Sequence, residues 1–429
     1  MKNFDLFIND LKRLIACRPV YEKDGSGYPF GKCIKNALDT FLDIADKMGF
    51  ETHNYDDYMG EVVFGEGEEV GIIGHLDVVP VGSGWSTEPF NLTIKDDALF
   101  GRGVADDIGP LLLCLYALKQ LKDEGVLPNR KFRIFAGCDE ETGWRDVDYF
   151  NTVGRFSEYG FSPDGNFPVV YAEKGMAIIT FKIPHLKNFC FLKGGTVVNA
   201  VCGEATVCAK TDACERALTP VLRAKHGLMT LDNGIIKSVG KSCHGSMPEQ
   251  GVNALKALFE YFAEVGEDVG RVNDYLFNDK SGLRKIGNEQ GYVTLSPDIV
   301  KEEADGIYID CDCRFPAPLS LGDLLPVFDT FGIEYVAAEK HPSFMVEKEG
   351  DFVQTLLGAY NEVMGVKALP QAQNGSTFAR VFEKGCAFGA EFPNVPSTIH
   401  QPNENISIAD VKKMYNIYYL ALKNFAEKP

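Results

Sequence analysis

Residues 71–80 read Gly71-Ile-Ile-Gly-His75-Leu-Asp77-Val-Val-Pro80, an apolar run that ends in a histidine and an aspartate. The run itself, residues 70–74, is typical of a buried strand. At strand spacing, the side chains of His75 and Asp77 point to the same side. A carboxylate two residues from a histidine can hold the imidazole ring and fix its tautomer for metal binding. The alternative is a structural histidine in the core, followed by an aspartate in a turn.

Strands and helices are expected to alternate around this stretch, up to about Gly175. Two further apolar runs predict buried strands at 61–64 and 131–136. Apolar residues at helical spacing predict helices at 4–16, 35–48 and 109–125. Because strands and helices alternate, an α/β domain with a mainly parallel sheet is predicted.

The pattern changes after Gly175, where four expected strands accompany one expected helix. The strands are 177–183, 205–210, 291–295 and 307–313, and the helix is 252–265. This segment predicts a separate α+β domain. From about His341 the first pattern returns, with a helix at 351–364 and a strand at 386–389. Ser407 and Asp410 form a capping-box pattern that opens a last helix.

The expected domain organisation is therefore one α/β domain in two parts, interrupted by an inserted α+β domain. The two parts are 1–178 and 341–429, and the insertion is 179–340. A length of 429 residues suits two or three domains.

The composition, 45% apolar and 24% charged, is ordinary for a soluble globular protein and excludes disordered and fibrous classes. No apolar run reaches the roughly 18 residues of a membrane-spanning helix, and the first residues predict an amphipathic helix rather than a signal peptide. The net charge of −18 repels phosphate backbones and anionic lipids. Neither nucleic acid nor a membrane is an expected partner.

Twelve cysteines occur without any C-x-x-C pair. Cys202, Cys208 and Cys214 recur every six residues, and Cys311 and Cys313 form C-x-C. Each stands among small apolar residues, so we expect buried hydrophobes rather than metal ligands or disulfides. A reducing, cytoplasmic compartment is the corresponding expectation.

Two acidic loops follow the expected strands of the first domain. The first reads Gly101-Arg-Gly103-Val-Ala-Asp106-Asp107. It is not a dinucleotide-binding loop, because Asp106 replaces the third glycine and would repel a pyrophosphate. Its acids are either helix caps or a carboxylate that bridges two cations. The second loop reads Asp139-Glu140-Glu141, which is either a solvated loop or part of a metal site.

Two more segments add possible ligands. Asp164 follows Phe161-Ser-Pro in a turn, and His400 opens His400-Gln-Pro-Asn-Glu404 before the last helix. The remaining histidines are expected to be surface or structural residues: His53, His185, His226 and His341. The candidate ligands are His75, Asp106, Glu141, Asp164 and His400. Two imidazoles and three carboxylates suit two divalent ions such as Zn, Mn or Co, which activate water and polarise a carbonyl.

In combination these segments resemble the M20 metallopeptidase family, closest to its bacterial dipeptidase branch typified by peptidase V. The resemblance covers nearly the whole chain. It rests on GHLDVVPVGSGW, GRGVADDIGP, AGCDEETGW, FSPDGNFPVVYAEKG, CHGSMPEQGVNA, NGSTFA, CAFGAEFP and IHQPNEN. It implies a catalytic domain of the zinc-peptidase type with an inserted lid domain.

The resemblance also implies a role for each site residue. His75 and Asp164 would bind one metal ion, Glu141 and His400 the other, and Asp106 would bridge both. Asp77 would orient His75, and Glu140 would be the general base that takes a proton from the attacking water. In the lid, His244 would stabilise the oxyanion. Asn199 and Arg314 would bind the carboxylate of the substrate.

The expected function is hydrolysis of dipeptides by a two-metal enzyme, and the enlarged insertion implies a monomer. One alternative is an N-acyl-amino-acid deacylase, as in other branches of this family. Another is a non-catalytic peptide-binding protein, for which Ile108 in place of the family's usual lysine is the only support. Asn374 also departs from the family pattern, where a glycine is usual.

Overall fold

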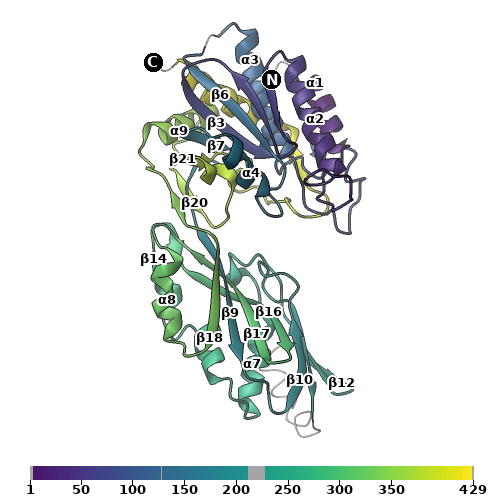
Figure 1. Ribbon diagram of the computed structural model, residues 1–429, viewed down its shortest axis with the longest axis vertical. Coiled ribbons are helices and arrows are strands. Elements are labelled where there is room, and N and C mark those ends of the chain that lie inside the picture. Colours follow the sequence, from purple (N-terminus) through teal and green to yellow (C-terminus); the bar gives the residue numbers. More distant parts are fainter. Residues whose placement is uncertain (1–2, 127, 211–227, 428–429) are drawn as a thin grey trace. The chain divides into compact units, whose positions relative to one another are not determined.

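The computed structural model describes residues 3–126, 128–210 and 228–427. Contacts divide the chain into two compact units (Figure 1). The first unit comprises Met1–Tyr171, Val346–Gln371 and Thr377–Pro429, and the second comprises Ala172–Met345 and Ala372–Ser376. The second unit is thus an insertion in the first. The sequence-based boundaries at 178 and 340 remain a prediction.

The first unit is built on a mixed sheet with the strand order β1-β2-β6-β3-β7-β21-β8. Its strands are β1 (Glu51–Tyr55), β2 (Met59–Phe64), β6 (Arg130–Gly137), β3 (Glu68–His75), β7 (Tyr159–Ser162), β21 (Lys384–Ala387) and β8 (Val170–Glu173). Two short strands, β19 (Phe344–Met345) and β20 (Gln371–Gln373), pair with β8.

The centre of this sheet is parallel. Strands β6, β3, β7 and β21 run parallel, whereas β1, β2 and β8 pair antiparallel at the flanks. The predicted α/β class is therefore confirmed, with a parallel centre between antiparallel edges. Strands β3, β6 and β7 end at His75, Gly137 and Ser162. The loops that follow parallel strands meet at one edge of a sheet, where α/β proteins place their sites.

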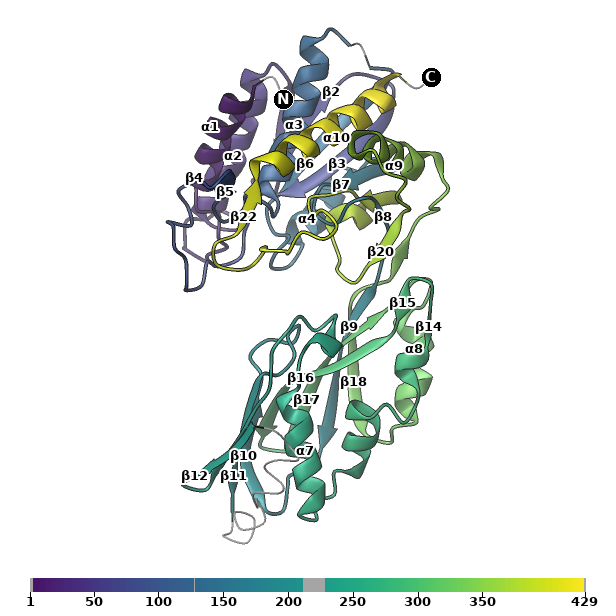
Figure 2. The ribbon, with the colours of Figure 1, turned by 180° about the vertical axis from the view of Figure 1, so that it is seen from behind.

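Helices bury both faces of the sheet. They are α1 (Phe4–Ile15), α2 (Lys32–Lys47), α3 (Ile108–Asp123), α4 (Arg145–Val153), α9 (Asp351–Met364) and α10 (Ile408–Glu427). Ile72 packs in the large core cluster with α1, α2, α3, α9 and α10, whereas its neighbour Ile73 packs in a smaller cluster with α4. Figure 2 shows α3 and α10 crossing the same side of β3 and β6. Successive side chains of β3 thus pack against helices on opposite faces of the sheet, as expected for a strand that is buried on both faces.

A small antiparallel sheet brings the last part of the chain to the loop before α3. It consists of β4 (Thr93–Lys95), β5 (Ala98–Phe100) and β22 (Asn405–Ser407), and Asn405 pairs with Phe100. Helix α10 directly follows β22. The predicted cap at its start is confirmed, because the Oγ atom of Ser407 accepts the N–H of Asp410 at 3.0 Å. The segment before β22 therefore lies beside the segment after β5.

The second unit is an antiparallel sheet with the order β12-β13-β11-β10-β16-β17-β9-β18. Its strands are β9 (Gly175–Ile183), β10 (Phe189–Gly194), β11 (Glu204–Ala209), β12 (Leu228–Asp232), β13 (Ile235–Val239), β16 (Thr294–Glu303), β17 (Gly306–Phe315) and β18 (Glu334–His341). Helices α7 (Ala254–Glu264) and α8 (Leu321–Asp329) pack with its apolar face in one core. The predicted α+β character is confirmed.

One predicted strand of the second unit, at 291–295, is divided. Strands β14 (Gly287–Asn288) and β15 (Gly291–Tyr292) form a short hairpin, and β16 begins only at Thr294. Gly291 has a φ of 115°, which directs the chain into a turn that an apolar pattern does not reveal.

The structure also bears on the expectations about membrane-spanning helices and about cysteines. None of the helices in the described ranges combines the length and the hydropathy needed to cross a bilayer. Every described cysteine is a free thiol, and Cys202, Cys311 and Cys313 are buried, as expected for small hydrophobes, whereas Cys208 is only partly buried. Cys214 and His226 lie outside the described residues.

Candidate metal centre and active site

His75 is buried at the end of β3 with only 1% of its surface exposed. Its Nδ1 atom lies 2.8 Å from the backbone oxygen of Asp77. A carbonyl can only accept, so Nδ1 carries a proton, and in the neutral ring Nε2 offers its lone pair. Nε2 faces two carboxylates, at 3.0 Å from Oδ1 of Asp106 and 3.7 Å from Oδ2 of Asp164. This tautomer is the one that a metal-binding histidine needs.

Asp77 joins the end of β3 to the loop that follows β6. Its two carboxylate oxygens accept the backbone N–H groups of Glu140 and Glu141, at 3.1 and 3.0 Å. The nearer carboxylate oxygen is 3.6 Å from Nδ1 of His75, so the backbone oxygen makes the closer contact with the ring. Burial raises the pKa of Asp77 to about 6. Asp77 therefore contacts both the histidine and the backbone of the two glutamates.

Asp106 lies between two imidazoles. Its Oδ1 atom faces His75, and its Oδ2 atom is 2.9 Å from Nε2 of His400. The same nitrogen of His400 is 3.1 Å from Oε1 of Glu141. Burial alone would raise the pKa of Asp106, but hydrogen bonds from His400 and His75 outweigh it and lower the pKa. One carboxylate thus faces both histidines, as a carboxylate that bridges two cations would.

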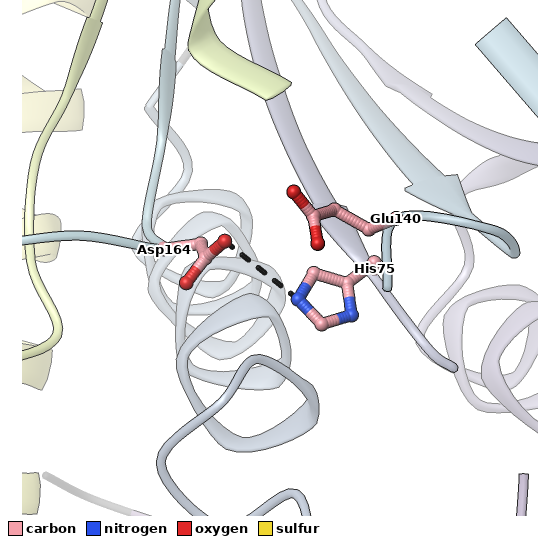
Figure 3. Close-up of side chains that lie close together, drawn as sticks. All are labelled: His75, Glu140 and Asp164. Atoms are coloured by element: carbon pink, nitrogen blue, oxygen red, sulfur yellow. Dashed lines mark ion pairs between the residues drawn. The ribbon is translucent and has the colours of Figure 1, made fainter. Parts of the chain in front are cut away.

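Glu140 and Asp164 approach His75 from two different loops. Figure 3 shows both carboxylates directed toward the imidazole. Ligand atoms of these three residues lie within 4.8 Å of one another, and so do those of His75, Asp106 and Glu141. The two sets share His75 and together include four carboxylates. The geometry alone therefore lets Glu140 act either as a ligand or as a base beside the ions.

The charges of this cluster suit added cations. Burial lowers the pKa of His400, but hydrogen bonds from Asp106 and Glu141 outweigh it and raise the pKa to about 11. The pKa of His75 is likewise raised well above its usual value, because its contacts with Asp106 and Asp164 outweigh burial. The surrounding carboxylates thus favour the protonated form of both imidazoles in the protein alone. Imidazole nitrogens and carboxylate oxygens are the donors that Zn, Mn and Co accept, so the residues fit divalent ions.

Asp107 is a buried acid that the sequence offered as a possible helix cap. It stands at the N-cap of α3, but its side chain makes no capping hydrogen bond. Its Oδ2 atom accepts the backbone N–H of His75 at 3.2 Å, and its Oδ1 atom has no hydrogen-bond partner among the described residues. A side chain at Gly74 would overlap with this carboxylate, which explains the glycine before His75. Ile108, the departure from the family pattern, is fully buried at the start of α3.

In the second unit, His244 is held in one tautomer. Its Nδ1 atom accepts the backbone N–H of Ser246 at 3.2 Å and lies 2.7 Å from the Ser246 hydroxyl. In the neutral ring the proton is therefore on Nε2. The next residue, Gly245, donates its N–H to the backbone oxygen of Asn199 at 2.7 Å. The side chain of Asn199 is exposed.

Arg314 belongs to the same cluster of the second unit. Its Nε and Nη2 atoms bind the two oxygens of Asp312, at 2.7 and 3.0 Å, and leave Nη1 outside this ion pair. A Cβ atom at Gly245 would lie 2.9 Å from Oδ2 of Asp312 and 3.0 Å from Oδ2 of Asp298. The turn that carries His244 therefore rests on the carboxylate that orients Arg314. The structure brings Asn199, His244 and Arg314 together.

The other histidines were expected to be surface or structural residues. His53 pairs with Glu51 and His185 with Glu302, both at the surface, and His341 ends β18. Sequence reasoning assigned no role to Arg102, Glu404, Asp298 or Asp312. Arg102 and Glu404 stand inside segments already quoted as motifs, whereas Asp298 and Asp312 stand in strands with no local acidic pattern.

Comparisons with known proteins cover nearly the whole chain. A profile described as peptidase family M20/M25/M40 matches residues 71–424. A protein of Bacillus subtilis (strain 168) named "Putative dipeptidase YtjP" is 30% identical over 450 residues, which cover 98% of this chain and 97% of that protein.

Two solved structures share the fold. The dipeptidase Dug1p from Saccharomyces cerevisiae superposes with a TM-score of 0.62 at 15% identity and covers 99% of this chain and 97% of its own. The YXEP protein of Bacillus subtilis, described as a dinuclear metal binding peptidase, gives a TM-score of 0.51 at 10% identity, covering 99% of this chain and 100% of its own. At these identities the likeness establishes the fold, and it confirms the predicted class.

Proposed function

This chain belongs to peptidase family M20/M25/M40, which makes it a peptide-bond hydrolase, and from that premise we propose that it is a two-metal dipeptidase. Its substrates are dipeptides or very short peptides with a free N-terminus. The observation that carries this proposal is Asp106, whose two oxygens face His75 and His400 at 3.0 and 2.9 Å. The name of the Bacillus subtilis relative supports the choice of a dipeptide substrate.

We assign the ligands to two ions. His75 and Asp164 would hold one, Glu141 and His400 the other, and Asp106 would bridge them. The contacts of Asp106, and that of His400 with Glu141, support this division. When bound, divalent cations at such a site polarise the scissile carbonyl and lower the pKa of the attacking water. The proposed ions are Zn or Mn, with Co as a further candidate, because the donor set accepts all three.

Glu140 is the proposed general base. It would take a proton from the attacking water and later deliver that proton to the nitrogen of the leaving amine. Its backbone N–H is fixed by Asp77, and its carboxylate points toward His75 and Asp164 (Figure 3). Asp77 is thus the proposed positioning residue for both the base and the first imidazole.

The second unit supplies the proposed substrate contacts. In its neutral tautomer His244 presents an Nε2–H, which is a donor suited to a developing oxyanion. Arg314 has its guanidinium plane set by Asp312, and the remaining nitrogen can bind a carboxylate of the substrate. Asn199 is assigned the same substrate carboxylate.

The deciding experiment compares two substrate classes. The protein is stripped with a chelator, Mn or Zn is added back, and amine release is measured from dipeptides and from the matching N-acetyl amino acids. Metal-dependent cleavage of dipeptides alone is the expected result. Faster cleavage of the acetylated set would instead identify a deacylase. Tight peptide binding without cleavage of either set would identify a binding protein.

Two proposals concern the whole protein. We propose a monomer, because the insertion between the two parts of the first unit is long, and a stable dimer in light scattering would overturn this. We also propose a cytoplasmic location, which the free thiols of the described cysteines support. Cell fractionation tests that location.

A further inference from the structure

Beneath the metal centre, the first unit buries an ion pair between two motifs that are far apart in sequence. Nη1 of Arg102 is 2.7 Å from Oε2 of Glu404, and the two side chains are 1% and 0% exposed. Arg102 precedes the loop that carries Asp106, and Glu404 ends the loop that carries His400. A buried pair of this kind is weak evidence for stability, because apolar residues of similar size often stabilise as well. Stability alone therefore does not explain why this ion pair is buried here.

The second oxygen of Glu404 supplies that explanation. Oε1 accepts the backbone N–H groups of Gly103 and Ala105 at 3.0 Å each, and that of Asp106 at 3.3 Å. The backbone oxygen of Glu404 also accepts the N–H of Gly101 at 3.1 Å. Glu404 thus accepts hydrogen bonds from four backbone N–H groups of the 101–106 loop. Three converging N–H groups define the path of that loop more closely than a single contact could.

Residues next to the ion pair connect the same two loops to a third segment. The Arg102 guanidinium lies 5.4 Å from the ring centre of Trp85. The side-chain oxygen of Asn403 accepts the backbone N–H of Ser86 at 2.7 Å. These contacts join the 101–106 loop and the 400–404 loop, respectively, to the segment that follows Asp77. The three segments that carry His75, Asp106 and His400 therefore share one polar junction, which is buried at Arg102 and Glu404 and exposed at Ser86.

We propose that Glu404, held in place by Arg102, is the positioning residue that sets Asp106 against His400 and so tunes the affinity of the paired metal site. This inference rests on the proposed assignment of Asp106 and His400 as ligands. Groups that orient metal ligands typically change metal affinity by about 10- to 100-fold when they are removed. Glu404 acts through the backbone of the Asp106 loop rather than through contact with the ions.

The test is Glu404→Gln in the full chain. Glutamine keeps the shape and one acceptor oxygen, but it turns an N–H₂ group toward the Arg102 guanidinium, where two donors face each other. Co²⁺ is titrated into chelator-treated protein, and both the binding isotherm and the visible absorption spectrum are recorded. We expect about 10- to 100-fold weaker binding of at least one ion, with an altered spectrum.

The matched control is Glu61→Gln. Glu61 and Arg133 also form a buried ion pair in the first unit, at 2.5 Å, with 4% and 8% of the side chains exposed. The variant removes a comparable buried charge from a pair that contacts none of the proposed ligands. We expect it to lower the unfolding temperature and to leave the Co²⁺ affinities and spectrum unchanged.

The outcomes separate this inference from the proposed function. If the wild-type protein fails to bind two ions, the proposed metal centre is wrong. If the wild type binds two ions and Glu404→Gln binds both with wild-type affinity and spectrum, the positioning role is wrong. An equal loss of affinity in Glu61→Gln would also overturn it, because the effect would then be general destabilisation. Should Glu404→Gln fail to fold, Arg102→Lys takes its place with the same criteria, since lysine keeps the charge but loses the planar fork.

Discussion

Both units bury carboxylates, but they compensate the negative charge in different ways. In the second unit, Asp312 is bound by both Nε and Nη2 of Arg314, which is a permanent cation within the fold. In the first unit, the acids around His75 and His400 face imidazoles, whose charge depends on protonation. Arg102, a permanent cation of the first unit, is directed at Glu404 instead.

The two regions thus differ in the source of the positive charge that compensates their buried acids. Burying a charge is costly unless it is paired, so a cluster with a built-in guanidinium is stable as it stands. A cluster of acids matched only by titratable imidazoles accepts cations in exchange for protons. The first region is therefore suited to added ions, whereas the Asp312–Arg314 pair of the second is compensated within the fold. Four predictions test this contrast.

The largest effect is expected from Glu140→Ala in the first region. Removal of a general base should lower kcat by about 10²- to 10⁴-fold. Both metal ions should remain bound, as measured by elemental analysis of the purified variant. If one ion is lost, Glu140 is a ligand, as its place beside His75 and Asp164 also permits. Turnover within a few-fold of wild type would exclude it as the base.

The next effect concerns the built-in cation of the second region. Arg314→Lys keeps the charge but cannot bind Asp312 at two points and a substrate carboxylate as well. Loss of a charged hydrogen bond is worth about 1.5–3 kcal/mol, so kcat/KM should fall by about 10- to 100-fold, mainly through KM. Metal content should not change. An unaltered KM would remove Arg314 from the substrate site and weaken the contrast between the regions.

A stability effect is expected from Asp298, an acid of the second region that lacks a direct cation. Burial raises its pKa from 3.8 to about 8. Between these values the folded state keeps a proton that the unfolded state releases, so stability falls as pH rises, by up to about 1.4 kcal/mol per pH unit. Asp298→Asn removes this dependence. Urea unfolding at pH 5 and pH 8 should show a smaller loss in the variant, and parallel losses would contradict the assignment.

The smallest effect is expected from Ser246→Ala. The hydroxyl contact with His244 is lost, but the backbone N–H of residue 246 still donates to Nδ1 and preserves the tautomer. One neutral hydrogen bond is worth about 0.5–1.5 kcal/mol, so kcat should fall by about 2- to 10-fold. Ser246→Thr should restore most of it. A loss as large as that of Glu140→Ala would mean that the hydroxyl itself acts in the reaction.

The sequence predicted the candidate ligands of the first region, but not the residues that hydrogen-bond to the loops carrying them. His75, Asp106, Glu141, Asp164 and His400 were all inferred as candidate ligands, and the structure brings these side chains together. His75 ends an apolar run, and Asp106 and Glu141 stand in acidic loops. Asp164 stands in a turn and His400 in the segment before the last helix, so a local pattern marks each of the five. Asp107 and Glu404 stand in the same motifs, but their roles depend on backbone N–H groups of other residues, which no pattern of side chains encodes.

The fold shows the same limit. Strands with a continuous apolar run, such as β3 and β6, were predicted close to their observed bounds. Strand β1 was missed because its five residues, Glu51–Tyr55, are exposed or only partly buried and mostly polar. Strand β7 was missed because it has four residues and owes its place to pairing with β3 and β21. Asp298 and Asp312 form a cluster only through the register of β16 and β17.

The place of β21 in the first sheet has a consequence for biosynthesis. This strand pairs parallel with β7 and also contacts β8, although nearly all of the second unit is translated between β8 and β21. On the ribosome, the strands of the second unit's sheet are all available once β18 has emerged. The first sheet must wait for residues 384–387, and the His400 loop follows still later. The inserted unit can therefore complete its sheet before the unit that encloses it in sequence, and His400 joins Asp106 and Glu141 last.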